Sequence, residues 1–200
     1  MLKIALTGPS GSGKGYVSAL LSRRGIPCLD TDRVVHDLYE REDFARKLQS
    51  VLSSEILDAK GRIDRKKLGA LVYSDEKMME KLLRTVYPEV RREILSFFEK
   101  NAAADAPAVA VDAPQLFEAG FESDFDAVLC VTAPKSLRLS RVTARDGISR
   151  AEALLRFSHQ MPAREYEKRS TAVIRNNGKR DVKKDLDNIL LRYGVWNGNG

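Results

Sequence analysis

The chain has 200 residues, of which 43% are hydrophobic and 31% are charged. This length and apolar content predict one globular domain with a sizeable core, and they exclude a second full domain. The formal net charge of +6 favours anionic partners. Small phosphorylated molecules and nucleic-acid backbones are both anionic, so the charge alone does not separate an enzyme from a nucleic-acid binder.

The N-terminal sequence, the length of the apolar runs and the cysteines indicate the cellular compartment. The N-terminus lacks the basic and apolar regions of a signal peptide, and no apolar run approaches the roughly 20 residues that a membrane span needs. Cys28 and Cys130 lie in apolar, strand-like contexts without ligand spacing. This favours buried thiols over a disulfide or a metal site. We therefore expect a cytoplasmic protein that binds no membrane and has no protein metal ligands.

A glycine-rich stretch follows the first apolar segment, residues 3–7, and runs Gly8-Pro-Ser-Gly-Ser-Gly-Lys14. The spacing G-x-x-x-x-G-K is that of a phosphate-binding loop, in which backbone N–H groups converge on an anion and the lysine reaches the outer phosphates. Apolar residues on one helical face follow within residues 16–23, so the stretch lies between a strand and a helix. A plain turn is the alternative, but this context favours a nucleotide-phosphate site.

The first half of the chain then predicts a second strand over residues 26–29 and a helix from Asp30 through Tyr39. Residues 43–101 read as almost wholly helical with a turn at Gly61, because apolar side chains recur at helical spacing. We expect this region to be a helical insertion. Asp32, near the start of the first of these helices, is a candidate base for activating a substrate hydroxyl, with helix capping as the alternative. Asp30 fits a structural role at least as well.

The second half predicts an alternating β/α order, which is typical of a parallel sheet with helices on its faces. Unbroken apolar runs predict buried strands at 108–111 and 127–132, and a short last strand is expected at 172–174. Helices are expected at 134–145, 149–160 and 181–191, with a frayed tail over 196–200. Arg138, Arg141 and Arg145 share one helical face, either as a lid over a transferred phosphate or as a solvated basic surface.

Six sequence blocks follow one another along nearly the whole chain: ALTGPSGSGK, GIPCLDTDRVVH, DAKGRIDRKKLGALVYSDEKMMEKLLRTVYPEV, VDAPQLFEAG, SRVTARDGISRAEALLRFSHQMP and VIRNNG. In this order they resemble the dephospho-coenzyme A kinase family. The resemblance implies an α/β, P-loop kinase fold with a five-stranded parallel sheet in one domain. It places the core at about 1–40 and 105–200, the helical insertion at about 41–104 and a lid at about 138–165.

The same resemblance implies ATP-dependent phosphorylation of the 3′-hydroxyl of dephospho-CoA, which gives coenzyme A and ADP. Asp32 would be the base, Lys14 would stabilise the transferring group and Arg141 would be the lid arginine. ATP would be held by Asn176 and by the loop residues Gly11, Ser12, Gly13, Lys14, Gly15 and Tyr16. Magnesium would be bound mainly through phosphates and water, and we expect a monomer whose partner is the small-molecule substrate, with no nucleic acid.

The chain departs from the family pattern at Gly15 and Tyr16, where a hydroxyl pair is usual, and at Tyr87, Gln115 and Arg175. The loop departures predict weakened metal or ATP binding. Two alternatives therefore stay open: a catalytically silent relative that binds nucleotide or a CoA-like ligand as a sensor, and a kinase for another small nucleotide. The insertion segment GRIDRKKLGALVYSDE favours the coenzyme A enzyme over the second alternative, with Arg65, Lys66 and Lys67 available for the anionic part of its substrate.

Overall fold

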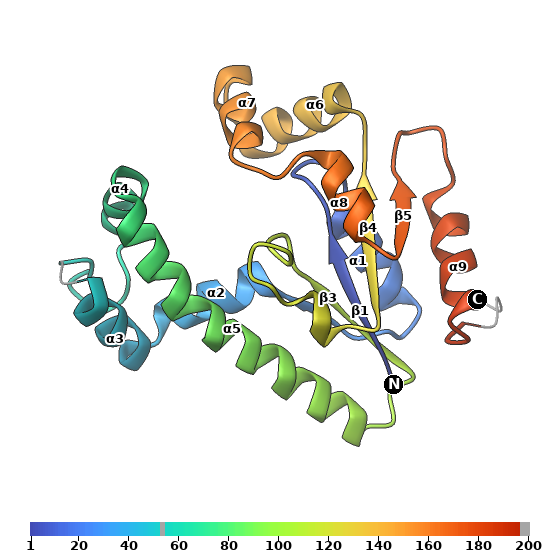
Figure 1. Ribbon diagram of the computed structural model, residues 1–200, viewed down its shortest axis with the longest axis horizontal. Helices are drawn as coiled ribbons and strands as arrows, with labels where there is room; N and C mark the ends of the chain where they lie inside the picture. The colour runs from blue at the N-terminus through green and yellow to red at the C-terminus, as the bar shows by residue number, and fades with distance from the viewer. Residues whose placement is uncertain (53–54, 197–200) are drawn as a thin grey trace. The chain divides into compact units, whose positions relative to one another are not determined.

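The computed structural model describes residues 1–52 and 55–196 and contains a five-stranded sheet in the order β2-β3-β1-β4-β5 (Figure 1). Its strands are β1 (Leu2–Thr7), β2 (Cys28–Asp30), β3 (Ala108–Asp112), β4 (Ala127–Thr132) and β5 (Ala172–Arg175). β1 lies between β3 and β4 and pairs parallel with both, and β4 pairs parallel with β5. The predicted α/β fold with a five-stranded parallel sheet is confirmed.

The chain forms two compact units, one from residues 1–29 and 98–200 and the other from residues 30–97. The first unit holds the sheet, a short 3-10 helix (Glu122–Asp124), α1 (Lys14–Arg23), α6 (Lys135–Asp146), α7 (Arg150–Ser158), α8 (Ala163–Arg169) and α9 (Val182–Arg192). The second holds α2 (Thr31–Glu40), α3 (Glu42–Leu52), α4 (Arg65–Ser74) and most of α5 (Glu76–Ala103). No helix among the described residues is both long and apolar enough to cross a membrane.

The core of the first unit lies where the sheet meets α1 and α9. Every residue of β4 is buried, and so are residues 108–111 of β3, as expected for parallel strands that are covered on both faces. Leu21 of α1 and Leu186 of α9 are fully buried in the same cluster. Trp196, expected in a frayed tail, packs against this cluster, while the other tail residues, 197–200, lie outside the described residues.

In the second unit, the expectation that residues 43–101 are almost wholly helical is wrong for residues 55–64, which are not helical. Leu57 and Ile63 form an antiparallel bridge, and the carboxylate of Asp58 accepts the N–H groups of Lys60 and Arg62 across the turn at Gly61. An Asx-type turn competes with the helix for these N–H groups. The helices on either side bury the expected apolar face, for example Leu48 of α3.

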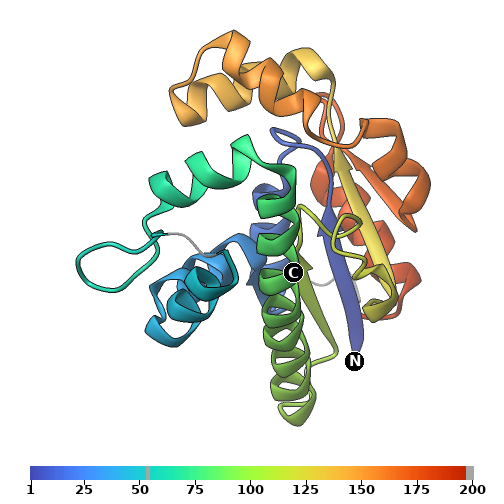
Figure 2. The same ribbon diagram turned by 60° about the vertical axis from the view of Figure 1, so that its left-hand side comes forward.

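In the first unit, α6 and α7 lie beyond the end of β1, beside the loop that leads into α1 (Figures 1 and 2). They match the helices expected at 134–145 and 149–160. α8 was not predicted from the sequence, and it spans only seven residues after Pro162. The loop that follows β1 and the paired helices α6 and α7 are therefore the parts of this unit that build the candidate site.

Candidate phosphate-binding site

The loop between β1 and α1 has a backbone that only glycine adopts without strain at three positions. Gly8, Gly11 and Gly13 have φ values of 130°, 78° and 97°. A side chain would also collide with the surroundings. A Cβ on Gly8 would lie 2.2 Å from the carbonyl oxygen of Val131, and one on Gly13 would lie 2.2 Å from Nδ2 of Asn176. The glycine pattern of the sequence is thus a steric requirement of this loop.

The loop ends at the start of α1, where Gly13 is the N-cap residue and makes no side-chain capping bond. The first-turn N–H groups of a helix lack partners within the helix and carry its positive dipole end, which suits an anion. Lys14 is the first residue of α1, and its Nζ donates a hydrogen bond of 2.9 Å to the carbonyl of Gly8. The lysine side chain therefore runs back along the loop.

Two side chains from distant elements close the loop. Arg141 of α6 donates from Nη1 to the carbonyls of Gly11 and Ser12, both at 3.2 Å, and from Nη2 to Oδ1 of Asn176, also at 3.2 Å. Asn176 follows β5, and its Nδ2 donates to the Ser12 carbonyl at 3.0 Å. The residues predicted for the phosphate site are thus brought together with the predicted lid arginine and Asn176.

The two unusual loop residues leave open space rather than a clash. A Cβ on Gly15 would meet no atom within 4 Å, and the Tyr16 side chain is 53% exposed. Ser12 is fully buried, and its hydroxyl has no hydrogen-bond partner among the described residues. The loop therefore offers one buried hydroxyl and room at position 15, and these features fit a magnesium ion held chiefly by phosphate and water oxygens.

The two aspartates at the junction of β2 and α2, Asp30 and Asp32, have different positions. The carboxylate of Asp30 accepts the N–H groups of Asp32 at 2.9 Å and Arg33 at 3.3 Å, which makes Asp30 the N-cap of α2. Asp32 lies exposed in the first turn of that helix, in the second unit. The capping role that was the alternative for Asp32 thus belongs to Asp30.

The three arginines on the basic face of α6 have different partners. Arg138 and Arg141 reach the loop, whereas Arg145 pairs with Asp146. The guanidinium of Arg145, with that of Arg156, lowers the pKa of the Asp146 carboxyl to about 2. Arg138 is only 8% exposed, and burial lowers its pKa. Arg138 and Arg141 are therefore not part of a solvated surface.

Sequence reasoning missed Gln160, which follows α7. Its Oε1 accepts the Ser10 N–H at 3.1 Å, and its Nε2 donates to the Ser10 hydroxyl at 2.8 Å. Gln160 lies in one of the blocks that resemble the family, but a glutamine carries no charge and fits no helical or strand spacing, so its residue type alone did not indicate this role.

The two cysteines are free thiols, with Cys130 buried and Cys28 partly buried. Burial raises the pKa of the Cys130 thiol to about 12, which keeps it protonated and removes it from the candidates for a nucleophile. Among residues 1–52 and 55–196, no group of three or more His, Cys, Asp or Glu side chains could hold a metal ion.

Comparisons with known proteins agree with this geometry. The family model for dephospho-CoA kinase matches residues 2–181. Curated dephospho-CoA kinases from Geobacillus kaustophilus and Thermus thermophilus are each 38% identical to the chain, over 96% of both chains in the first case and over 98% of this chain and 95% of the relative in the second.

Solved structures agree as well. A crystal structure from Thermus thermophilus has a TM-score of 0.80 at 38% identity, covering 97% of this chain and 96% of that one. Dephospho-CoA kinase from Campylobacter jejuni has a TM-score of 0.70 at 22% identity, with 96% of each chain covered, which shows a shared fold. The loop geometry, the family match over most of the chain and the full-length relatives lead to one conclusion: the chain belongs to the dephospho-CoA kinase family.

Proposed function

We propose that the protein transfers the γ-phosphoryl group of ATP to the ribose 3′-hydroxyl of dephospho-CoA, producing coenzyme A and ADP. The observation that carries the proposal is the closed phosphate loop, with Lys14, Arg141 and Asn176 held on it, in a chain whose full-length relatives are named for this reaction. Phosphoryl transfer requires mainly positioning and charge stabilisation, and these residues supply both.

Asp32 is the proposed base. Its carboxylate accepts the proton of the 3′-hydroxyl as that oxygen attacks the γ-phosphorus, and the bond from the γ-phosphorus to the bridging oxygen breaks to release ADP. Asp32 is exposed in the first turn of α2, with Asp30 serving as the cap. A positioned base of this kind contributes about 10²- to 10⁴-fold in rate.

The remaining residues handle the phosphates. The N–H groups from Gly11 through Tyr16 surround the ATP phosphates, and Lys14 neutralises charge on the transferring group. Arg141 reaches the same loop from α6, so its charge acts beside the phosphates, while Asn176 keeps Arg141 and the Ser12 carbonyl in register. Charges fixed in advance in this way stabilise the transition state without reorganising during the reaction.

Magnesium is the proposed metal, supplied with ATP and held mainly by phosphate oxygens and water, with no residue assigned as its ligand. When bound, it neutralises the charge that develops on the phosphates. Asp112, at the end of β3, pairs in register with Leu6 of β1, so it is the carboxylate placed on the strand next to the loop. Asp112 would help to hold the metal beside the phosphates.

The insertion is proposed to recognise the acceptor. Arg65 begins α4, and its guanidinium lies over the ring of Tyr39 at 5.9 Å, while Lys67 donates to the Leu57 carbonyl at 3.2 Å. Of the basic residues named for this role, Arg65 is the one whose charge is supported on an aromatic face. The expected boundaries, 41–104 for the insertion and 138–165 for the lid, and a monomeric state remain proposals.

The test is ADP release by the purified protein with ATP and magnesium. Dephospho-CoA, AMP and adenosine are compared as acceptors at equal concentration. The proposal expects ADP formation that depends on dephospho-CoA and exceeds that with the other two. Preferred phosphorylation of AMP or adenosine would point to another nucleotide kinase, and ATP binding without turnover on any acceptor would favour the silent relative.

A further inference from the structure

We infer that Gln160 and Arg138 hold the phosphate loop in its ATP-binding shape through one residue, Ser10, and are therefore positioning residues for nucleotide binding. The inference deepens the proposed function, because it concerns how the same loop is kept ready for ATP. Neither side chain is asked to touch the phosphates.

Ser10 is bound at each of its polar groups by side chains from the α6–α7 part of the chain. Its N–H donates to Oε1 of Gln160 at 3.1 Å, and its hydroxyl accepts from Nε2 of the same residue at 2.8 Å. Its carbonyl accepts from Nη1 of Arg138 at 3.4 Å. A backbone segment whose N–H, carbonyl and hydroxyl are all engaged has lost most of its freedom to move.

Arg138 carries features that a surface arginine lacks. It is 8% exposed, its guanidinium lies over the ring of Phe157 of α7 at 4.6 Å, and its Nε has no hydrogen-bond partner among the described residues. None of the described residues forms an ion pair with it. Burying an unpaired cation is costly, so its position needs an explanation beyond stability. A polyanion bound at the neighbouring loop would supply the missing negative charge.

The backbones of the phosphate loop and of α6 also pack directly against each other at Gly11 and Arg138. A Cβ added to Gly11 would lie 2.5 Å from the Arg138 carbonyl oxygen and 2.9 Å from its Cα. The backbone of α6 is thus packed directly on the loop, one residue beyond Ser10. Because Gln160 follows α7, the contacts to Ser10 also tie the far end of the helix pair to the same point. A movement of α6 and α7 would therefore shift the backbone of the loop.

The test measures ATP affinity by calorimetry without acceptor, for the wild-type protein, Gln160→Ala, Ser10→Ala and the double variant. His159→Ala is the matched control, since that residue is exposed and adjacent to Gln160. Gln160→Ala removes two hydrogen bonds to the loop, so we expect the Kd for ATP to rise about three- to tenfold, the range of one modest hydrogen-bond contribution. His159→Ala is expected to leave it unchanged.

Comparing the double variant with the two single variants separates a positioning role from a general loss of structure. Ser10→Ala keeps the N–H bond and loses only the hydroxyl contact, so its effect should be smaller, and the double variant should bind ATP no more weakly than Gln160→Ala alone. The KM for ATP should rise while the KM for dephospho-CoA stays constant, and the thermal midpoint is recorded for each variant.

An unchanged ATP affinity in Gln160→Ala, or effects of the two substitutions that multiply, would overturn the inference. Because ATP affinity is measured without acceptor, these results are independent of whether dephospho-CoA is the substrate. If Gln160→Ala does not fold, Ser10→Ala decides instead, and wild-type ATP affinity in Ser10→Ala would then contradict the inference.

Discussion

Single residues of the phosphate loop act mainly through shape. Gly13 needs its positive φ and lies against the Asn176 amide, whereas Gly15, two residues later, lies inside α1 with open space beside it. Gly13 of the motif and Gly15, which follows it, thus have opposite tolerance to a methyl group.

Gly13→Ala and Gly15→Ala form a matched pair that tests this difference. We expect Gly13→Ala to weaken ATP binding at least tenfold and to lower the thermal midpoint, because the new Cβ must displace Asn176 and adopt a φ of 97°. Gly15→Ala should keep or raise the thermal midpoint, since alanine is favoured over glycine in a helix by up to about 1 kcal/mol. Calorimetry and thermal melting provide the readouts, and equal midpoints for the two variants would contradict the steric account.

The double substitution Gly15→Ser with Tyr16→Thr tests whether the unusual loop residues limit the site. A Cβ at position 15 would meet no atom within 4 Å, so there is room for a serine, and the Tyr16 side chain is exposed, so its replacement costs little packing. A hydroxyl at this position can bind magnesium directly. We therefore expect a lower magnesium concentration at half-maximal ADP release, with similar thermal stability. If magnesium dependence and turnover both stay at wild-type values, positions 15 and 16 do not limit the enzyme.

At the residue scale, the sequence could predict the loop and Lys14 from a motif, and the family resemblance pointed to Arg141 and Asn176. The structure places these side chains against the loop, and their roles in the reaction stay proposals. The sequence could not divide the capping role between Asp30 and Asp32, since either aspartate suits a helix start. Gln160 was beyond reach because its role depends on a contact 150 residues away in the chain.

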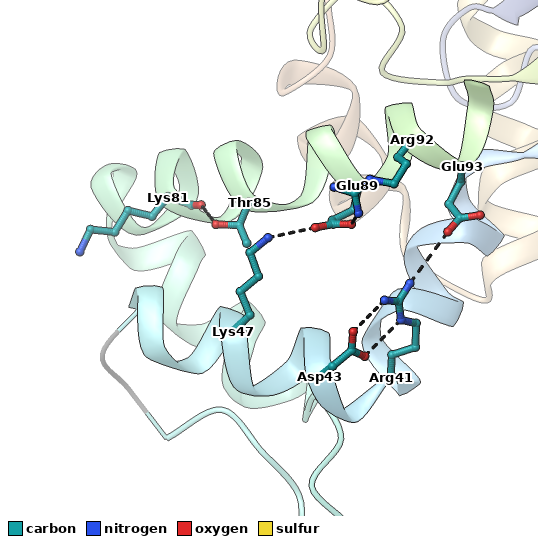
Figure 3. Close-up of polar contacts among 8 residues, drawn as sticks. All are labelled: Arg41, Asp43, Lys47, Lys81, Thr85, Glu89, Arg92 and Glu93. Atoms are coloured by element: carbon teal, nitrogen blue, oxygen red, sulfur yellow. Dashed lines mark hydrogen bonds and ion pairs between the residues drawn. The ribbon is translucent and has the colours of Figure 1, made fainter. Parts of the chain in front are cut away.

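Among the elements, α3 and α5 are joined by ion pairs around one buried carboxylate (Figure 3). Oε1 of Glu89 on α5 accepts from Nζ of Lys47 on α3 at 2.9 Å, and Oε2 accepts from Arg92 one turn along α5. The Glu89 side chain is 9% exposed. Each carboxylate oxygen thus has its own cation, the condition under which a buried charge is tolerated.

Glu89→Gln tests this connection and its pH dependence. The hydrogen bond from Lys47 lowers the pKa of Glu89 in the folded protein, so the folded state binds this proton more weakly than the unfolded state. The stabilisation is complete above the ordinary glutamate pKa and is lost as the pH falls through the lowered value. We expect Glu89→Gln to lower the free energy of unfolding by about 1–2 kcal/mol at neutral pH. Below about pH 4 this difference from the wild-type protein should become progressively smaller.

Glu93→Gln is the control on the same helix. Glu93 is 47% exposed and lies 3.9 Å from Arg41, so its loss should cost under about 0.5 kcal/mol. Urea unfolding between pH 3 and 7 measures both variants. If both substitutions lower the free energy of unfolding equally, or if the effect of Glu89→Gln grows as the pH falls, the stabilising role of the Glu89 ion pairs would be contradicted.

Elements with a strong period were predictable, and short or irregular ones were not. Apolar spacing located α3 and α5, and unbroken apolar runs located β3 and β4. The turn over residues 55–64 was missed because it is set by the Asp58 carboxylate binding backbone N–H groups. α8 was missed because seven residues contain too few turns for a period to show.

For the whole molecule, the alternation of strands and helices predicted the parallel sheet, and apolar side chains at helical spacing over residues 43–101 predicted the helical insertion, which the family resemblance also implies. The proposed groups divide between the two compact units: Lys14, Arg141 and Asn176 lie in the first, and Asp32 lies in the second. The central claim, that this chain is a kinase rather than a silent nucleotide binder, therefore depends on chemistry at Asp32 together with binding at the loop.

The most direct measurement of that claim is the turnover and ATP affinity of Asp32→Asn beside those of Asp30→Asn, with dephospho-CoA as acceptor. Asparagine remains a good helix cap, so Asp30→Asn should keep both values near wild type. Asp32→Asn should lower turnover by at least about 100-fold while the Kd for ATP stays within about twofold. Wild-type turnover in Asp32→Asn, or no turnover in the wild-type protein, would contradict the account.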